Sequence, residues 1–151
     1  MNCMLLLFCT LLINCGAHSH DNNPEQSDRG LTLKIKEVRN HDGLVRIGLY
    51  WDKKEYTDNP SGSYAFRKDT LLSDTLIFTL KNIAAGTYAI SVLDDENEDN
   101  KMNYRLVVWP DEGFGFSNNP MINRPVKPKY EDISFEYDGI QKVMEITIVY
   151  F

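Results

Sequence analysis

The chain has 151 residues, of which 42% are hydrophobic and 25% are charged, a composition typical of one globular domain. Asp and Glu outnumber Lys and Arg by 22 to 16, which gives a net charge of −6. This charge disfavours nucleic-acid phosphates and anionic membrane surfaces as partners, and it leaves small molecules, cations and proteins.

All three cysteines, Cys3, Cys9 and Cys15, lie at the N-terminus, so the rest of the chain has no disulfide, thiolate metal site or cysteine nucleophile. The apolar run from Met4 to Ile13 is too short for a membrane-spanning helix of about 20 residues but suits the apolar core of an export signal. No Lys or Arg precedes it, although export signals normally carry positive charge there. "LINC" at residues 12–15 resembles the lipobox of bacterial lipoproteins, which is cut before a cysteine that then carries lipid.

We therefore expect a lipoprotein-type signal peptide at residues 1–14, lipid on Cys15, a flexible linker over 15–30 and a folded domain over 31–151. Plain export after a site such as Ala17 and a retained apolar N-terminus are the alternatives. The expected location is the cell envelope, with the lipid anchor as the sole membrane contact, or otherwise the periplasm or the medium. In the linker, His18, His20 and Asp21 are weak transition-metal candidates because ordering a flexible segment costs entropy.

The first strands show alternating apolar and polar residues. Leu31, Leu33 and Ile35 alternate with polar residues, and the alternation resumes over Val45–Trp51. Between them, "NHDG" at residues 40–43 contains Asp-Gly, which favours a tight turn, so these two strands are predicted to form a hairpin. Residues 52–70 lack sustained periodicity and predict a long excursion with a short edge strand near Tyr64 and Phe66.

The second half of the chain also predicts short strands separated by turns and loops. Strands are expected at 76–80, at 88–92 and at 104–109, the last ended by Pro110, while 113–120 is expected to be loop. A strand at 133–137, a second Asp-Gly turn and a closing strand at 144–150 follow. About seven strands without a helical period predict an all-β fold, an antiparallel β-sandwich of immunoglobulin-like or transthyretin-like kind.

The stretch "DDENEDNKMN" at residues 94–103, hereafter the acidic loop, has the spacing of a calcium loop. Counted from Asp95, side-chain oxygens fall at positions one, three, five and nine, and Asn100 at position six tolerates the left-handed conformation needed there. Position twelve is Leu106, which excludes a strict helix–loop–helix calcium hand, so Asp111 or Glu112 would have to close the shell. The predicted calcium ligands are Asp95, Asn97, Asp99, Lys101 through its backbone carbonyl, Asn103 and Glu112.

Charge favours a cation in the acidic loop. Its five acids face only Lys101, and like charges about 6 Å apart repel by about 0.7 kcal/mol per pair even in water. A divalent ion would relieve several such pairs at once. The alternative is an exposed acidic turn that water and salt screen without an ion.

The segments "AAGTYAISVLDDENEDNKMN" and "PDEGFGFSNNP" together resemble the bacterial family catalogued as domain of unknown function 2141. The chain departs from the family pattern at Asp94, where His is frequent, at Glu98 and Asn100 in place of glycines, and at Asn103 in place of Asp. The resemblance implies a secreted or envelope β-sandwich and no assigned activity. The matching residues are Asp95, Glu96, Asn97, Lys101, Glu112, Gly113, Gly115, Phe116, Ser117, Asn118 and Asn119.

The stretch "GFGFSNN" at residues 113–119 has two interpretations. In the first, the stretch is a structural brace: its glycines allow the backbone to turn tightly, and Phe114 and Phe116 anchor it. Ser117, Asn118 and Asn119 then form hydrogen bonds with nearby backbone. Alternatively, these five residues and the acidic loop share one end of the domain and form a binding surface.

Catalytic arrangements are sparse. His41 is the one histidine of the expected domain, and no nucleophile elbow accompanies it. Paired loop acids invite a glycosidase, but they rarely have the burial that tunes such groups. Tyr50, Tyr56, Tyr64 and Trp109 could stack on sugars or pack in the core. We expect a non-enzymatic envelope module, calcium-bound through its acidic loop, that binds an unknown protein or glycan; sugar or small-ligand binding, and then a carboxylate hydrolase, are the alternatives.

Overall fold

The computed structural model describes residues 30–57, 59–106 and 108–151. The predicted signal peptide, Cys15 and the linker residues His18, His20 and Asp21 lie outside this part of the chain. Gly30, expected to end the linker, is instead the first residue of a strand. Among the described residues, no helix has the length and apolar character to cross a membrane.

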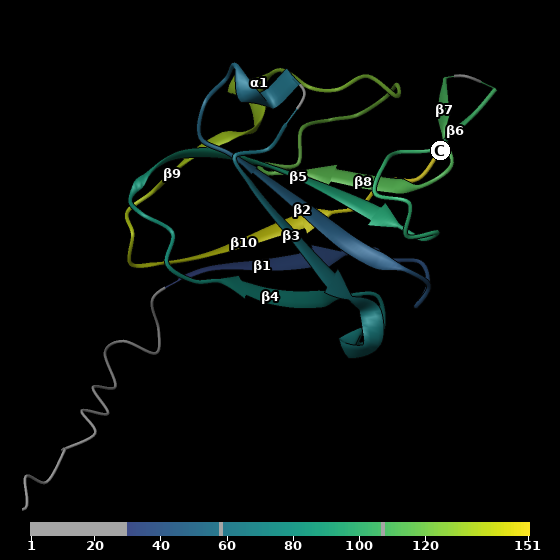
Figure 1. Ribbon diagram of the computed structural model, residues 1–151, viewed down its shortest axis with the longest axis horizontal. Coiled ribbons are helices and arrows are strands. Elements are labelled where there is room, and N and C mark those ends of the chain that lie inside the picture. The colour runs from purple at the N-terminus through teal and green to yellow at the C-terminus, as the bar shows by residue number, and fades with distance from the viewer. Residues whose placement is uncertain (1–29, 58, 107) are drawn as a thin grey trace, which may run out of the picture.

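The described chain is almost entirely strand and loop, which confirms the predicted all-β class (Figure 1). Its helical elements are the single turn α1 (Tyr130–Ile133) and the 3₁₀ turns Glu55–Thr57 and Lys68–Thr70. The strands are β1 (Gly30–Lys36), β2 (Leu44–Tyr50), β3 (Gly62–Arg67), β4 (Leu76–Leu80), β5 (Gly86–Asp95), β6 (Tyr104–Arg105), β7 (Trp109–Pro110), β8 (Gly113–Phe116), β9 (Ser134–Tyr137) and β10 (Gln141–Thr147).

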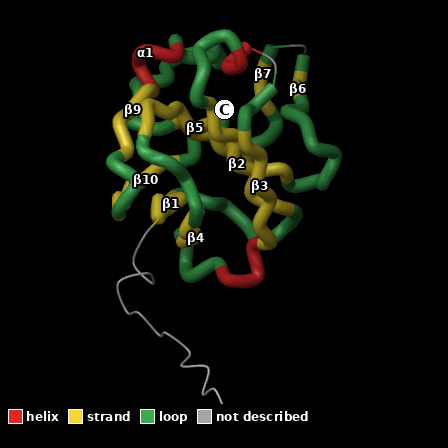
Figure 2. Tube along the Cα trace, turned by 60° about the vertical axis from the view of Figure 1, so that its left-hand side comes forward, coloured by secondary structure: helices red, strands yellow, loops and turns green. Residues whose placement is uncertain are grey.

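The strands form two larger sheets and one small hairpin. The first sheet has the order β10-β1-β4, and the second has the order β3-β2-β5-β8, with β9 also paired to β5. β6 and β7 pair only with each other and, like α1, lie on the side of the second sheet in both views of the molecule (Figures 1 and 2). All pairs are antiparallel except β1 with β10, which is parallel.

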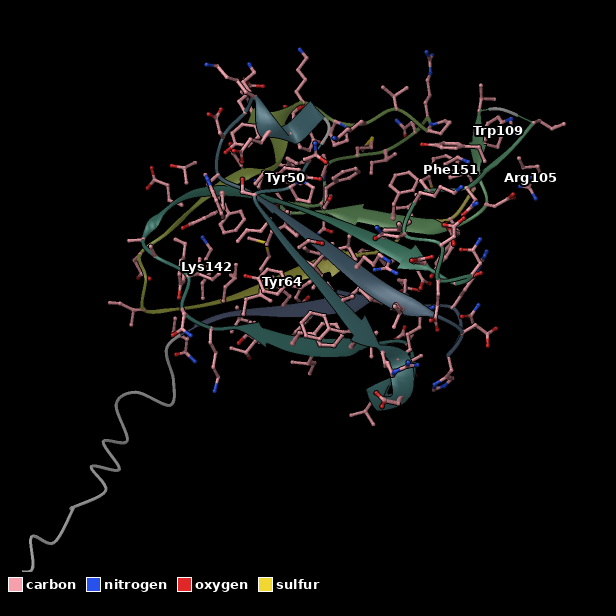
Figure 3. The ribbon with its side chains drawn as sticks, viewed as in Figure 1. Tyr50, Tyr64, Arg105, Trp109, Lys142 and Phe151 are labelled. Atoms are coloured by element: carbon pink, nitrogen blue, oxygen red, sulfur yellow. The ribbon has the colours of Figure 1, made fainter. Side chains whose placement is uncertain are left out.

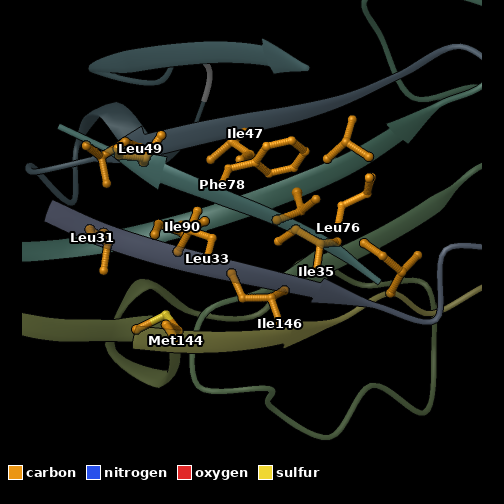
Figure 4. Close-up of a cluster of buried hydrophobic side chains, with 14 of the residues drawn as sticks. Leu31, Leu33, Ile35, Ile47, Leu49, Leu76, Phe78, Ile90, Met144 and Ile146 are labelled. Carbon is orange, nitrogen blue, oxygen red and sulfur yellow. The ribbon is translucent and has the colours of Figure 1, made fainter. Parts of the chain in front are cut away.

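One hydrophobic core joins the two larger sheets (Figure 4). The alternation read from the sequence places Leu31, Leu33 and Ile35 of β1 and Ile47 and Leu49 of β2 in this core, with at most 1% of each exposed. Burying a side chain of this size contributes about 1.5–3 kcal/mol. The core therefore holds the two larger sheets together, and the loops described below connect the strands of these sheets.

The predicted hairpin between the first two strands is wrong. β1 pairs with β4 and β10, while β2 pairs with β3 and β5. Gly43 takes a left-handed conformation, with φ 72°, as in tight Asp-Gly turns, but the turn carries the chain from one sheet to the other. The reason is that both apolar faces cover the same core from opposite sides. The second Asp-Gly turn, where Gly139 has φ 81°, also changes sheets.

Two further predictions need correction. The strand expected over 104–109 is two strands of two residues, β6 and β7, with the chain reversing between them. The loop expected over 113–120 begins with a strand, β8. Its glycines do not serve a turn; a Cβ on Gly113 would lie 2.3 Å from Tyr150 Cε1, and one on Gly115 would lie 2.8 Å from Ile146 Cγ2. They let β8 approach the C-terminal segment closely.

The remaining strand predictions agree with the structure in position, but two have shifted ends: β9 begins at Ser134 because Ile133 belongs to α1, and β10 runs over Gln141–Thr147 in place of 144–150. The strand near Tyr64 and Phe66 is β3, at the edge of the second sheet, and those over 76–80 and 88–92 are β4 and part of β5. The closing strand ends at Thr147, and Val149 beyond it exchanges two backbone hydrogen bonds with Phe114. This exchange links the C-terminal segment to β8.

Candidate metal centre

The acidic loop starts at the end of a central strand. Asp94 and Asp95 are the last residues of β5 and are fully buried, while the loop beyond them leads to β6. Gly43 approaches this point so closely that a Cβ there would lie 2.1 Å from the Asp95 carbonyl oxygen. The first two acids are therefore held by the sheet, and those that follow stand at its rim.

Three of the predicted calcium ligands lie close together. Asp95, Asp99 and Glu112 each offer one carboxylate oxygen, and these oxygens all lie within 4.8 Å of one another. Glu112 directly precedes β8, and the β6–β7 hairpin folds the chain back so that its side chain, 4% exposed, reaches the loop. Asp111 is exposed, and its Oδ1 lies 3.7 Å from Arg105 Nε. Asp111 and Glu112 were the two candidates for the ligand missing at position twelve, and it is Glu112 that lies beside Asp95 and Asp99.

Asp95 organises the loop backbone. Its Oδ1 accepts a hydrogen bond from Asp99 N and its Oδ2 accepts one from Asn100 N, both at 3.1 Å. Asn100 has φ 66°, which confirms the left-handed conformation expected at position six. Leu106, at position twelve, is exposed and offers no ligand. Glu98, with φ 59°, is left-handed as well, which the spacing does not predict.

The two asparagines bond within the same loop. Asn97 Nδ2 donates to Asn103 Oδ1 at 3.2 Å, and Asn103 Nδ2 donates to Asp99 Oδ2 at 2.9 Å. Lys101 N donates to Asp99 Oδ1 at 3.1 Å. Its ammonium lies 3.8 Å from Asp99 Oδ2. Hydrogen bonding, chiefly from Asn103, lowers the pKa of Asp99, so its carboxylate stays charged at neutral pH.

Glu112 bridges the two ends of the loop. Its Oε1 accepts from Glu96 N at 3.1 Å, and its Oε2 accepts from Asn103 N at 3.2 Å. Burial raises the pKa of Glu112, and the neighbouring charge of Asp95 adds to the rise. A cation beside both groups would favour the charged form of Glu112 and so oppose this rise.

Two arginines set the local charge balance. Arg46 of β2 pairs with Asp95 Oδ2. Arg39 forms a bidentate pair with Glu96, at 2.6 and 2.7 Å, and so holds the pKa of Glu96 below its usual value. Glu96 is therefore paired with Arg39, Arg46 neutralises Asp95, and the exposed Lys101 ammonium lies near Asp99.

Asp94 belongs to a separate buried group. It continues the inward alternation of Tyr88, Ile90 and Val92, and its carboxylate contacts Lys68 and Tyr150. That alternation could have identified Asp94 as buried. No sequence signal identifies Lys68 as its partner, because Lys68 lies in a 3₁₀ turn far along the chain.

The predicted binding residues of the second motif are mostly internal. Phe114, Phe116 and Ser117 are buried, and Ser117 Oγ accepts from Ile90 N at 2.9 Å and donates to Ile133 O. The exposed asparagines also bond the protein's own backbone. Asn118 Nδ2 donates to Ser134 O, and the Asn119 amide bonds Glu145 O and Thr147 N, each at 2.8 Å. These contacts favour the brace; a ligand surface shared with the acidic loop stays a prediction.

The aromatic candidates for sugar stacking separate into two groups. Tyr50 and Tyr56 are buried against each other edge to face, and Tyr64 packs on the core. Trp109 is 44% exposed and lies beside Phe151 at the end of the chain (Figure 3). A cavity of about 200 Å³ opens nearby, lined among others by Tyr50, Met102, Tyr104, Phe114, Phe116 and Val126.

These features define an all-β domain with a carboxylate cluster at the rim of one sheet. The family described as an uncharacterized protein conserved in bacteria, DUF2141, matches residues 33–145. The chain belongs to this family, which confirms the resemblance seen in its two motifs. Comparisons with curated proteins and with solved structures gave no match.

Proposed function

We propose that this protein is a non-enzymatic binding or structural module of the cell envelope whose acidic loop, together with Glu112, binds calcium. The observation that supports this is the convergence of oxygens from Asp95, Asp99 and Glu112 within 4.8 Å. Calcium takes six to eight oxygen ligands, and carboxylates, asparagine side chains and backbone carbonyls all serve it. Asn97, Asn103 and the Lys101 carbonyl would complete such a shell.

The charge balance favours a cation. Arg46 offsets the buried Asp95, whereas Asp99 is paired with the exposed Lys101 ammonium at 3.8 Å, a screened contact, so the three clustered carboxylates keep an excess of negative charge. A Ca²⁺ ion would neutralise this excess and would join the two ends of the loop that Glu112 already bridges. Weak extracellular calcium modules bind with dissociation constants of about 10⁻⁴ to 10⁻³ M, which sets the affinity to test.

A thermal melt of the purified chain with and without calcium tests this proposal. An ion that binds only the folded state raises the melting temperature, and at 100 times the dissociation constant it adds about 2.7 kcal/mol. We expect a rise with millimolar calcium that a chelator reverses. An unchanged midpoint at about 5 mM calcium, above the weak extracellular range, would sink the proposal.

Two loop variants separate ligation from charge. Asp99→Asn and Glu98→Gln each remove one negative charge from the exposed part of the loop, but only Asp99 belongs to the oxygen cluster. We expect Asp99→Asn to lose most of the calcium-dependent rise and Glu98→Gln to keep it. Equal losses in both variants would indicate a diffuse electrostatic effect in place of a site.

The envelope location rests on Cys15 and the apolar run before it. Expression in a bacterium supplied with labelled fatty acid should give a labelled, membrane-associated protein, and Cys15→Ser should abolish the label. A wild-type chain without label and soluble in the periplasm would leave plain export as the remaining route.

The cavity beside Tyr104 supports a second candidate, binding of a small apolar or sugar-like ligand. Its aromatic lining offers faces on which such a ligand could pack. Glycan-array or small-molecule binding lost in Tyr104→Ala, but kept in the exposed Leu72→Ala control, would favour this candidate. Turnover of chromogenic glycosides that is lost in Glu112→Gln would instead overturn the non-enzymatic assignment.

A further inference from the structure

Lys68 and Asp94 form a fully buried pair of oppositely charged groups. Lys68 begins the 3₁₀ turn after β3, and Asp94 lies near the end of β5; neither side chain is exposed to solvent. Lys68 Nζ contacts Asp94 Oδ1. An amine and a carboxyl group are therefore held against each other without access to water.

The polar neighbours of the pair are few and specific. Lys68 Nζ donates to Asn40 Oδ1 at 3.1 Å, and Tyr150 Oη donates to Asp94 Oδ2 at 2.5 Å. One carboxyl oxygen is thus held by a hydroxyl donor, while the other lies against the amine.

Burial makes this arrangement reactive as well as costly. Two charges removed from water carry a desolvation penalty of several kcal/mol each, which a single contact repays only with complete hydrogen bonding. Condensation to an amide would replace both buried charges by one neutral group, and the site holds the two reacting groups together as an intramolecular pair.

We propose that Lys68 and Asp94 condense into an intramolecular amide cross-link. Lys68 Nζ attacks Asp94 Cγ, so that the N–C bond forms. The bond from Cγ to the oxygen held by Tyr150 then breaks, and that oxygen leaves as water with two of the three protons that the Lys68 ammonium carried. The products are one secondary amide and one water molecule, and no oxidant or co-reactant is consumed.

Tyr150 is placed to assist as a positioning and proton-relaying residue. Its hydroxyl oxygen accepts a hydrogen bond from Arg39 N at 3.1 Å, and the Arg39 guanidinium lies 4.5 Å from the ring centroid. These contacts fix the hydroxyl on Asp94 Oδ2, where it can give a proton to the departing oxygen and take one from the nitrogen. Burial raises the pKa of Tyr150, which keeps the hydroxyl protonated.

The cross-link would tie the chain after β3 to the end of β5. This is the point at which the acidic loop begins, so the amide would anchor the loop's first residues whether or not a cation is bound. The inference is therefore independent of the proposed calcium site.

Mass spectrometry of the wild-type full chain tests the inference directly. The purified protein is denatured, reduced and digested, and its peptides are mapped. We expect one branched species in which the peptide containing Lys68 is joined to the peptide containing Asp94, lighter by one water than their sum. Dehydration at the Asp42-Gly43 or Asp138-Gly139 pair would also remove water, but it would join no two peptides.

Linear peptides carrying unmodified Lys68 and Asp94 throughout would overturn the inference and leave a buried ion pair. A branched species that joins Lys68 to Asn40, with loss of ammonia, would overturn this pairing as well. Because the decisive measurement is made on the wild type, it does not depend on any variant folding.

Two variants sharpen the assignment. Lys68→Arg keeps the positive charge but cannot form the amide, so its Asp94 peptide should be wholly linear. Tyr150→Phe keeps the ring and removes the hydroxyl; we expect the branched fraction after a fixed incubation to fall at least tenfold. An unchanged fraction in Tyr150→Phe would remove Tyr150 from the mechanism.

Discussion

The acidic loop and the "GFGFSNN" segment both match the family pattern, but their side chains have different roles in the structure. In the acidic loop, the side chains turn toward one another, and three carboxylates gather at the sheet rim. In the second segment, two phenylalanines and a serine point inward, and two asparagines fasten neighbouring backbone. Residues that match the family pattern therefore belong to a candidate ligand cluster in one segment and to a closely packed strand in the other.

The two segments also differ in the cost of disturbing them. The contacts of β8 are with atoms that cannot move away, such as the Thr147 carbonyl oxygen, 2.8 Å from the position of a Cβ on Gly115. The exposed part of the acidic loop faces solvent, and its polar groups bond one another and the loop backbone. Substitutions in β8 should therefore reduce stability, whereas those in the loop should mainly change its response to ions and pH.

Gly115→Ala should give the largest effect. Its Cβ would collide with Ile146 Cγ2 and with the Thr147 backbone, and overpacking of this kind costs about 1–3 kcal/mol or more. We expect a loss of about 3 kcal/mol in the free energy of unfolding, measured by urea denaturation. Gly62→Ala on the edge strand β3 is the control, because its Cβ would meet no atom closer than 3.5 Å. Similar stabilities for the two variants would contradict the packing role of Gly115.

Ser117→Ala should give the second largest effect. The substitution leaves the Ile90 N–H without its hydroxyl acceptor in a buried position, which costs about 1–3 kcal/mol. Urea denaturation should show a loss of about 2 kcal/mol. The exposed Ser63→Ala on β3 should change stability by less than about 0.5 kcal/mol. If Ser117→Ala behaved like Ser63→Ala, the hydroxyl would not be a brace.

The strands and the core face were predictable because alternation is a local property. The alternate residues Leu31, Leu33 and Ile35 and the alternate residues Tyr88, Ile90 and Val92 are buried, as a period of two predicts. The pairing of the strands was not predictable, because "NHDG" specifies a turn but not the sheet that the chain enters after it. The parallel pairing of β1 with β10 joins the two ends of the domain, which no local pattern records.

The candidate site was predictable to a similar extent. The spacing from Asp95 to Asn103 predicted the left-handed conformation of Asn100 but not that of Glu98. That Glu112 reaches the loop depends on the β6–β7 hairpin, for which the sequence predicts a single strand. The partners Arg46, Arg39 and Lys68 come from other strands and turns, so only the folded chain shows which acids they neutralise.

Glu96 and Glu112 should respond to pH with opposite sign in calcium-free protein. The pKa of Glu96 is lowered by Arg39, so its stabilising contribution is complete above its ordinary pKa of 4.5 and is lost as the pH falls through the lower folded value. The pKa of Glu112 is raised by burial, so stability is lost as the pH rises through its folded value. Only the first shift comes from a discrete ion pair.

The Glu96→Gln variant isolates that pair. At neutral pH we expect it to be about 1 kcal/mol less stable than the wild type, a modest value because the Arg39 side chain is partly exposed. The difference should shrink as the pH falls below 4.5, as measured by urea denaturation at a series of pH values with a chelator present. A difference that stayed constant down to acid pH would show that the charge of Glu96 is not what matters.

Glu98→Gly should give the smallest effect and the opposite direction. Glu98 has φ 59°, a left-handed conformation that costs a side-chain-bearing residue about 1–2 kcal/mol, and glycine removes this cost. Because glycine also gains freedom in the unfolded chain, the net stabilisation should be a few tenths of a kcal/mol, and at most about 1 kcal/mol. Glu98→Gln removes the same charge and keeps the Cβ, so it should leave the midpoint of urea unfolding nearly unchanged. Equal gains in the two variants would assign the effect to charge repulsion within the acidic loop and not to its backbone conformation.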